Sequence, residues 1–255
     1  MNCFMKKIIC CILIVCCAVS ILTCYAENPA ESVAQAKKEL EELSIIDTSS
    51  FSHENLVYRC EAIVPIMKMM GITKRLADIA SMGLHDPFYD LRDDEYLYFV
   101  LSNGSVIEPT RKQYGIEVNY YGYLRAGHEM FIVHGYKGNF RPYDAITAKE
   151  AAAFMMRGID VSFYYDIDVT YENAKQCGLV QKTDRFYEDG DIAVTKNEFC
   201  VLLNRMLYQP CCICFISKEI EPGKFYETQW RDENRTKRYI DIVNGDFPES
   251  EEVSR

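Results

Sequence analysis

The strongest constraint on the fold is a four-residue polar box that occurs three times, each time at the start of an apolar helical stretch. In such a box the first side chain accepts from the backbone N–H of the fourth residue, and a glutamate there bonds back to the first N–H. The stretch after each box repeats apolar residues at i, i+3, i+4 and i+7, as a buried helix face requires. The three boxes are Tyr58-Arg59-Cys60-Glu61, Thr147-Ala148-Lys149-Glu150 and Thr195-Lys196-Asn197-Glu198.

Each box is part of a longer sequence pattern that occurs three times. A first helical stretch ends in a small residue and two aliphatic residues, a loop with a phenylalanine follows, and the box then opens a second helix. The phenylalanines Phe51, Phe140 and Phe186 precede their boxes by seven, seven and nine residues. We therefore predict three helix–loop–helix units. Their first helices are expected within residues 34–47, 94–107 and 170–180.

These units divide the chain into segments. The part after residue 26 is long enough for one good core or two small ones. The expected segments are a signal peptide at 1–26, unit 1 at 27–84, unit 2 at 85–160 with an insertion at 108–139, unit 3 at 161–210, and a charged C-terminal tail at 211–255.

The insertion in the second unit is the most aromatic part of the chain. Its tyrosine, valine, isoleucine and phenylalanine residues are punctuated by glycine, which predicts a β-hairpin or a small ribbon. It also contains His128, Glu129 and His134. The two histidines are six residues apart, whereas a helical zinc pair needs four. In a hairpin they could share a face, but a surface position is favoured, and we predict no metal site.

Residues 1–26 have the composition of a secretory signal peptide. Lys6 and Lys7 precede an uncharged apolar run, and Cys24 and Ala26 supply the small residues of a cleavage site. The alternatives are an uncleaved membrane anchor and a lipoprotein acylated at Cys24. The apolar run is short for a membrane span of about 20 residues. We expect a secreted protein, with a membrane contact only if this segment stays uncleaved.

The charge of the chain excludes one class of partner. Its formal net charge is −10, and loss of the two lysines near the N-terminus makes it more negative. Such a chain repels nucleic acid and anionic membranes. There is no glycine-rich phosphate loop and no Gly-x-Ser-x-Gly elbow, so neither an enzyme nor a cofactor is predicted. A small exported hydrolase with an unrecognised site is a distant alternative.

Half of the twelve cysteines lie in residues 1–26. Three others fall at apolar helical positions, where a free thiol packs as a small hydrophobe. The last three form a cluster, for which a local disulfide and a metal site are both open, although no histidine lies close by. The helical cysteines are Cys60, Cys177 and Cys200, and the clustered ones are Cys211, Cys212 and Cys214.

The order of parts resembles the S-layer homology repeat of bacterial cell-surface proteins. That unit has Phe-x-Asp-Val, a helix led by tryptophan and ending near Gly-Ile, then Phe-x-Pro, and Ile-Thr-Arg-Ala-Glu at the start of a second helix. The resemblance covers about residues 36 to 208. The matching stretches are LSIID with FSHENLVYRCEAIVPIMKMMGI, PFYDL with GSVI and FRPYDAITAKEAAAFMMR, and FYYDI with CGLV and VTKNEFCVLLNRML.

The resemblance implies a mainly helical fold with three units around a pseudo-threefold axis. It also implies non-covalent anchoring to the wall, through an anionic and often pyruvylated secondary cell-wall polysaccharide held in grooves between units. The box arginine would bind the acid of the ligand, because a guanidinium offers a planar fork to a carboxylate. A helix N-terminus adds amide donors and a positive dipole. Here the box positions hold Arg59, Ala148 and Lys196, so the arginine is present once.

The ligand-binding residues predicted from this resemblance are Arg59, Lys196, Asp90, Asp166 and Tyr96. The two aspartates are also good helix caps, and the tyrosine is also a packing residue in place of the leading tryptophan. A second hypothesis makes the units a degenerate scaffold. The aromatic insertion, residues 111–139, would then bind another surface protein or a glycan.

Overall fold

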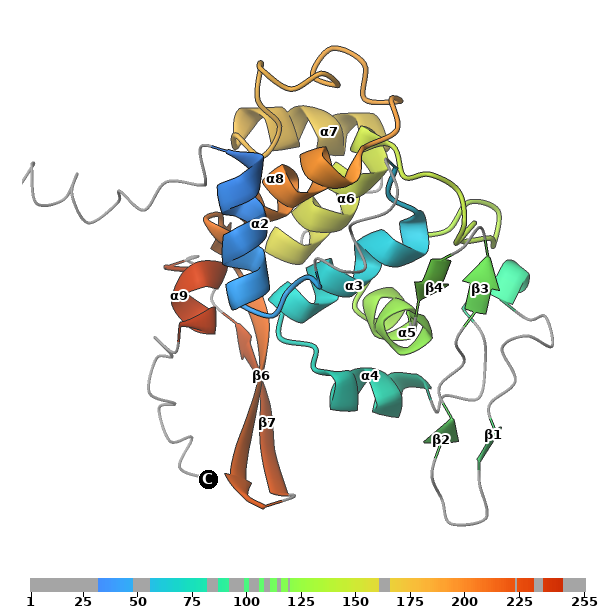
Figure 1. Ribbon diagram of the computed structural model, residues 1–255, viewed down its shortest axis with the longest axis vertical. Helices are drawn as coiled ribbons and strands as arrows, with labels where there is room; N and C mark the ends of the chain where they lie inside the picture. Colours follow the sequence, from blue (N-terminus) through green and yellow to red (C-terminus); the bar gives the residue numbers. More distant parts are fainter. Residues whose placement is uncertain are drawn as a thin grey trace, which may run out of the picture.

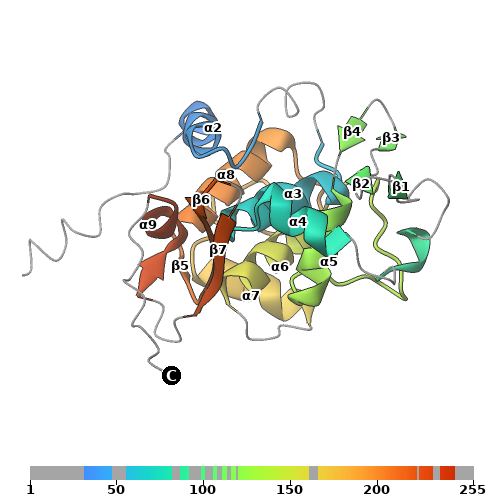
Figure 2. The ribbon, with the colours of Figure 1, turned by 90° about the horizontal axis from the view of Figure 1, so that it is seen from below.

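The fold is mainly helical, with helices packed on helices and short two-stranded sheets at the periphery (Figures 1 and 2). The predicted signal peptide, Phe51 and Tyr96 lie outside the residues that the structure describes. The computed structural model describes residues 32–47, 56–81, 87–91, 99–100, 106–107, 111–113, 116–118, 120–160, 166–222, 224–231 and 236–244.

The helices of the described residues are α2 (Val33–Glu42), α3 (Arg59–Met69), α4 (Lys74–Ser81), the 3-10 helix η1 (Tyr89–Leu91), α5 (Tyr121–Glu129), α6 (Ala148–Ile159), α7 (Ile167–Gln176), α8 (Lys196–Leu207) and α9 (Tyr239–Val243). The strands pair antiparallel, β1 (Phe99–Val100) with β2 (Val106–Ile107), β3 (Arg111–Gln113) with β4 (Ile116–Val118), β5 (Pro210–Cys211) with β8 (Lys237–Arg238), and β6 (Ile213–Glu221) with β7 (Lys224–Arg231).

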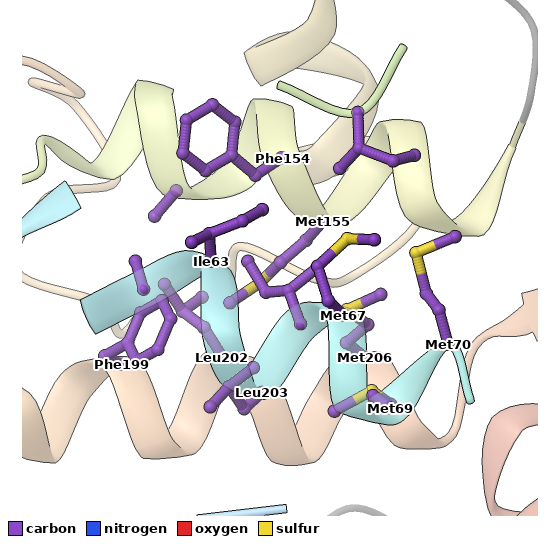
Figure 3. Close-up of a cluster of buried hydrophobic side chains, with 14 of the residues drawn as sticks. Ile63, Met67, Met69, Met70, Phe154, Met155, Phe199, Leu202, Leu203 and Met206 are labelled. Atoms are coloured by element: carbon purple, nitrogen blue, oxygen red, sulfur yellow. The ribbon is translucent and has the colours of Figure 1, made fainter. Parts of the chain in front are cut away.

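Helices α3, α6 and α8 form the centre of the core, and each begins at one of the three boxes, as predicted. Figure 3 shows their side chains interdigitating between the three ribbons. Each such side chain contributes about 1.5–3 kcal/mol when it is fully buried. The labelled core residues are Ile63, Met67, Met69 and Met70 from α3 and its end, Phe154 and Met155 from α6, and Phe199, Leu202, Leu203 and Met206 from α8.

The outer helices α2, α5 and α7 pack on α8, α3 and α6 respectively. All three end in the same turn, in which a residue in the left-handed region precedes two buried aliphatic residues. The amide of one of these aliphatics returns to a carbonyl in the last helical turn, which satisfies the helix end. The turns are Ser44-Ile45-Ile46 with φ 58°, Phe131-Ile132-Val133 with φ 61°, and Gly178-Leu179-Val180 with φ 81°.

One prediction for the second unit is wrong, and another is confirmed only in part. The expected helix at 94–107 is not present at its described residues, because Phe99–Val100 and Val106–Ile107 are paired strands. The insertion contains a hairpin only at β3–β4, and residues 121–129 form helix α5.

The glycines of α5 explain the error in the insertion. A Cβ at Gly122 would lie 2.2 Å from the carbonyl oxygen of Ala77 in α4, and one at Gly127 would lie 2.9 Å from Val133 Cγ2. These glycines let α5 approach its neighbours closely and do not punctuate strands. Tertiary packing therefore overrides the local β-like composition.

The segment expected as a charged tail is folded through Asn244. The Phe215 amide donates to the Met70 carbonyl over 2.7 Å, the Cys212 amide to the Ile159 carbonyl over 3.0 Å, and the Tyr239 hydroxyl to the Gly158 carbonyl over 2.6 Å. These bonds dock the segment on the C-terminal ends of α3 and α6. The β6–β7 hairpin then extends away from the helices (Figure 1). Within the described ranges, no helix has the length and apolar character needed to cross a membrane.

Candidate ligand-binding site

The three core helices are held together at their starts by a closed ring of backbone hydrogen bonds. The residue before each box supplies one donor and one acceptor. The Val57 amide donates to the Val194 carbonyl over 3.1 Å, the Val194 amide to Ile146 over 3.0 Å, and the Ile146 amide to Val57 over 2.8 Å. All three residues are fully buried. Buried backbone groups must be paired, so the ring fixes the three helix starts beside one another.

Two of the predicted capping boxes are complete. The hydroxyl of Thr147 accepts from the Glu150 amide, and the Glu150 carboxylate accepts from the Thr147 amide over 3.1 Å. Thr195 and Glu198 make the same pair of bonds. At the first box, Glu61 accepts from the Tyr58 amide over 2.9 Å. A tyrosine hydroxyl lies at the far end of its ring and is unsuited to the threonine's role.

Arg59, the predicted ligand clamp, is only 3 % exposed and has several protein partners. Its Nε donates to the Phe140 carbonyl over 2.7 Å, and its Nη1 lies 2.6 Å from Glu150 Oε1. The guanidinium also lies 4.9 Å from the ring centroid of Phe140 and 5.3 Å from that of Phe154. Burial lowers the pKa of Arg59, and the adjacent Glu150 opposes this shift. Arg59 therefore joins the start of α3 to the start of α6.

Lys196, the second predicted cation, forms an equivalent joint between α8 and α3. Its Nζ lies 3.3 Å from Glu61 Oε1, and the two side chains are 4 % and 7 % exposed. Both predicted cations thus have carboxylate partners from a neighbouring core helix. Their role as ligand clamps stays a prediction, and a ligand acid would have to compete with these ion pairs.

In the second box, the position of Arg59 and Lys196 is taken by Ala148, which provides no cation, and Glu198 of the third box is paired by Arg185 instead. Arg185 Nε donates to Glu198 Oε1 over 2.9 Å, and its Nη2 donates to Oε2 over 3.1 Å. Burial raises the pKa of Glu198, but the bonds from Arg185 and Thr195 outweigh it and bring the pKa below its usual value. This start of α6 is therefore the one without a box cation.

A groove of about 470 Å³ lies beside this start of α6. Its walls come from α6, from α7 and from the loop before the third box. Lys149 crosses the groove, with its Nζ 2.7 Å from Asp168 Oδ1 and 3.3 Å from Asp191 Oδ2. The hydrogen bond to Asp168 is the main cause of a raised Lys149 pKa. The lining residues are Lys149, Asp168, Val169, Tyr171, Glu172, Asn173, Lys175, Gln176, Glu188, Asp189 and Gly190.

Tyr171 and Lys175 line one wall of this groove, and Tyr187 packs against Lys175. The Tyr171 hydroxyl donates to the Phe186 carbonyl over 2.5 Å, which fixes its ring, and burial raises the Tyr171 pKa. Lys175 Nζ lies 4.9 Å from the ring centroids of both Tyr171 and Tyr187 and 2.7 Å from Glu172 Oε1. Both lysines of the groove therefore already contact carboxylates.

The charge of the groove sets the ligand chemistry that it suits. Its lining carries four carboxylates, at Asp168, Glu172, Glu188 and Asp189, against two lysines. Ionised carboxylates are acceptors only. The groove is therefore suited to a ligand with many hydroxyl donors, and less suited to a bare anion.

The two predicted aspartates accept hydrogen bonds from backbone amides. Asp166 is the N-cap of α7 and accepts from the amides of Asp168 and Val169 over 2.9 and 3.1 Å. Asp90 accepts from the amides of Phe140 and Arg141 over 2.8 and 2.6 Å and so ties η1 to the loop before the second box. Neither side chain lines the groove.

Sequence reasoning missed most of the groove. Lys149 is part of the second box, but the α7 residues that face it carry no motif. They reach Lys149 because α7 packs on α6. The loop before the third box is placed by the bonds of the Ala148 amide to the Ile192 carbonyl and of the Lys149 amide to the Gly190 carbonyl, over 3.0 and 2.9 Å. Such pairings between distant segments are not encoded by local spacing.

The histidines and cysteines of the described residues offer no obvious site. His128 lies in α5 and packs edge-on against Phe88, with ring centroids 5.1 Å apart. No group of three or more His, Cys, Asp or Glu residues in the described part of the chain is placed to hold a metal ion. The six cysteines that the structure describes are free thiols, including the cluster Cys211, Cys212 and Cys214.

No protein-family model, curated protein or solved structure matches this chain. The function is therefore argued from the geometry and the chemistry of the residues above.

Proposed function

We propose that the protein is a secreted, non-enzymatic cell-surface module that binds a secondary cell-wall polysaccharide. Its three helix pairs would be S-layer-homology-like units around a pseudo-threefold axis. The observation that carries this proposal is the closed ring of hydrogen bonds through Val57, Ile146 and Val194. Each ring residue precedes a polar box, which is the arrangement expected if the units surround one axis.

In this proposal the units are α2–α3, α5–α6 and α7–α8. The second unit starts at α5, so that residues 94–107 precede it. Two further contacts support the equivalence of the second and third units. Arg157 of α6 donates to the Ile132 carbonyl over 3.3 Å, and Arg205 of α8 donates to the Leu179 carbonyl over 3.1 Å. Both acceptors directly follow the left-handed residue that ends an outer helix.

The groove beside Lys149 is the proposed polysaccharide site. It lies between the second and third of these units, as the resemblance implies for the family's ligand. Its carboxylates would accept hydrogen bonds from sugar hydroxyls, and Lys149 would donate to a ring or hydroxyl oxygen. Arg59 and Lys196 would act through the scaffold, because their ion pairs join the starts of α3, α6 and α8, and α6 forms one wall of the groove.

A binding assay with purified bacterial cell walls tests this proposal. Residues 27–255 would be mixed with walls that retain their secondary polysaccharide and with walls from which it has been removed. We expect sedimentation only with the retained polymer, and at least a fivefold weaker binding for Lys149→Ala. The matched control is Lys182→Ala, which removes an exposed lysine outside the groove. Equal sedimentation with stripped walls, or none with either, overturns the proposal.

A further inference from the structure

Three aromatic side chains of the described residues are exposed, Tyr89, Phe131 and Tyr136, and the two tyrosines lie on neighbouring segments. Tyr89 of η1 is 61 % exposed and Tyr136 is 67 % exposed. Exposed single aromatics are common, but two on one small surface need an explanation. Figure 2 shows η1 and the chain that follows α5 together at one edge of the molecule.

Both tyrosines are held by a rigid loop. The Tyr89 amide donates to the Gly138 carbonyl over 2.7 Å, and Tyr136 and Asn139 exchange backbone hydrogen bonds of 2.9 and 3.0 Å. The Tyr89 ring covers Gly138, since a Cβ there would come within 2.4 Å of the ring. The same glycine has a φ of 81°, which a side chain would also strain. The tyrosines are therefore presented in a fixed arrangement, which lowers the entropy cost of binding.

The surface around the tyrosines carries cations, in contrast to the groove. Lys137 Nζ lies 5.2 Å from the ring centroid of Tyr136. Arg141 follows on the same loop and is 45 % exposed at its side chain, although it also contacts Asp144 and Glu150. An acidic substituent on a ligand would find in Lys137 a cation that projects from the loop beside an aromatic ring.

The loop that carries Tyr136 and the groove both contact the start of α6. Arg141 of this loop has its Nη2 2.6 Å from Glu150 Oε1 in the first turn of α6. The preceding residue, Lys149, lies in the groove with its Nζ 2.7 Å from Asp168 Oδ1. A polymer that binds both places would therefore pass the start of α6.

We propose that Tyr89 and Tyr136 form a stacking platform for sugar rings of the same polysaccharide, with Lys137 binding its acidic substituent. The C–H face of a pyranose is apolar and its rim is polar, which matches a flat ring with a hydroxyl tip. The groove then holds uncharged, hydroxyl-rich sugars, and the platform holds the part that carries the acid. This inference rests on the function proposed above and names a separate set of residues for it.

The test uses residues 27–255 and protein-free walls, with and without the secondary polysaccharide. The variants are Tyr136→Ala, the double variant Tyr89→Ala/Tyr136→Ala, and Tyr136→Trp, which keeps a stacking ring. The control is Ile79→Ala, which trims an exposed apolar side chain on α4. Thermal unfolding of each variant checks the fold. We expect a three- to tenfold loss for Tyr136→Ala, a larger loss for the double variant, and near wild-type binding for Tyr136→Trp and Ile79→Ala.

The outcomes separate this inference from the proposed function. If the Tyr136→Ala variant is folded and binds the polymer as well as wild type does, the stacking platform is overturned. The proposed function as a wall-binding module is then kept. If the protein binds walls without the secondary polysaccharide and this binding needs the tyrosines, the stacking platform is supported. The secondary polysaccharide is then not its ligand. No binding to either wall overturns both. If the tyrosines are needed for binding to intact cells, and protein-free walls are not bound, the surface binds a protein partner. This outcome overturns the stacking platform.

Discussion

The guanidinium of Arg59 at the start of α3 lies 2.6 Å from the carboxylate of Glu150 at the start of α6, with Arg59 almost completely buried. This pair links two core helices that are far apart in the sequence. Arg59, which the sequence predicts to face a ligand, instead joins α3 to α6. Its loss should therefore lower the stability of the fold.

Replacement of Arg59 by alanine should destabilise the protein by about 3–5 kcal/mol, because it breaks a buried ion pair and leaves the Phe140 carbonyl without its donor. Urea unfolding followed by circular dichroism measures the loss. Arg141→Ala is the matched control, since it removes an exposed arginine from the same carboxylate and should cost under about 1 kcal/mol. An Arg59→Ala protein as stable as wild type contradicts the structural role.

The Lys196–Glu61 pair should show strong coupling in a double-mutant cycle. Both side chains are buried, so either single change leaves a charge without its partner. With Lys196→Met and Glu61→Gln, we expect a coupling free energy of about 1–3 kcal/mol. The same cycle on the exposed pair Lys74 and Asp78 should give about 0.3–0.5 kcal/mol. Equal coupling in the two cycles would argue against a buried joint.

Removing the threonine of a complete capping box should cost about 1 kcal/mol. Thr147→Ala and Thr195→Ala each lose the acceptor for the amide of the box glutamate. Serine at either position should restore most of the stability, because it keeps the hydroxyl. Thr183→Ala, on an exposed turn, should change the unfolding free energy by less than about 0.5 kcal/mol. A serine variant no better than alanine would rule out the capping bond as the cause.

Alkylation should distinguish Cys177 from the buried cysteines. Burial raises the pKa of Cys200 to about 11 and that of Cys214 to about 12, so few thiolates form at pH 8. The pKa of the exposed Cys177 is also raised by burial of its sulfur, but iodoacetamide can reach it. Mass spectrometry of the native protein should show Cys177 modified at least tenfold faster. Rapid labelling of Cys214 would mean that the β6–β7 segment opens from the core.

Stability should fall as the pH drops from 7.5 to 5.5. Burial lowers the pKa of both His128 and His134, with Arg125 and Arg157 adding to the shift and Glu129 opposing it at His128. The unfolded chain therefore binds these protons first, near pH 6.5. The stabilisation is present above that pH and is lost as the pH falls through the lower folded pKa values. Urea midpoints at the two pH values should differ less in a His128→Asn/His134→Asn variant than in wild type.

The elements that could be predicted from sequence are those fixed by local chemistry. Helices α3, α6 and α8 begin where the boxes place them, and α2 and α7 lie in the stretches expected for them. A helix cap and the periodic spacing of apolar residues depend only on residues close together in the sequence. They can therefore be recognised before the fold is known.

The elements that could not be predicted depend on distant partners. Helix α5 needs Gly122 and Gly127 to approach other helices, and the same glycines suggest turns when taken alone. The groove needs Lys149 beside Asp168, and these two residues come from different helices, α6 and α7, that meet only in the folded chain. The burial of Arg59 follows from Glu150 and Phe140, each more than eighty residues away in sequence.

The ring of Val57, Ile146 and Val194 has a consequence for how such a chain can vary in length. Each member uses its donor on one neighbour and its acceptor on the other, so the circle has no open end. In a linear solenoid a repeat can be gained or lost at either terminus. Here the ring leaves no donor or acceptor of this kind for a further helix start, and removal of one member would break two of its three bonds. We therefore expect the starts of α3, α6 and α8 to be lost together when any one of them is removed.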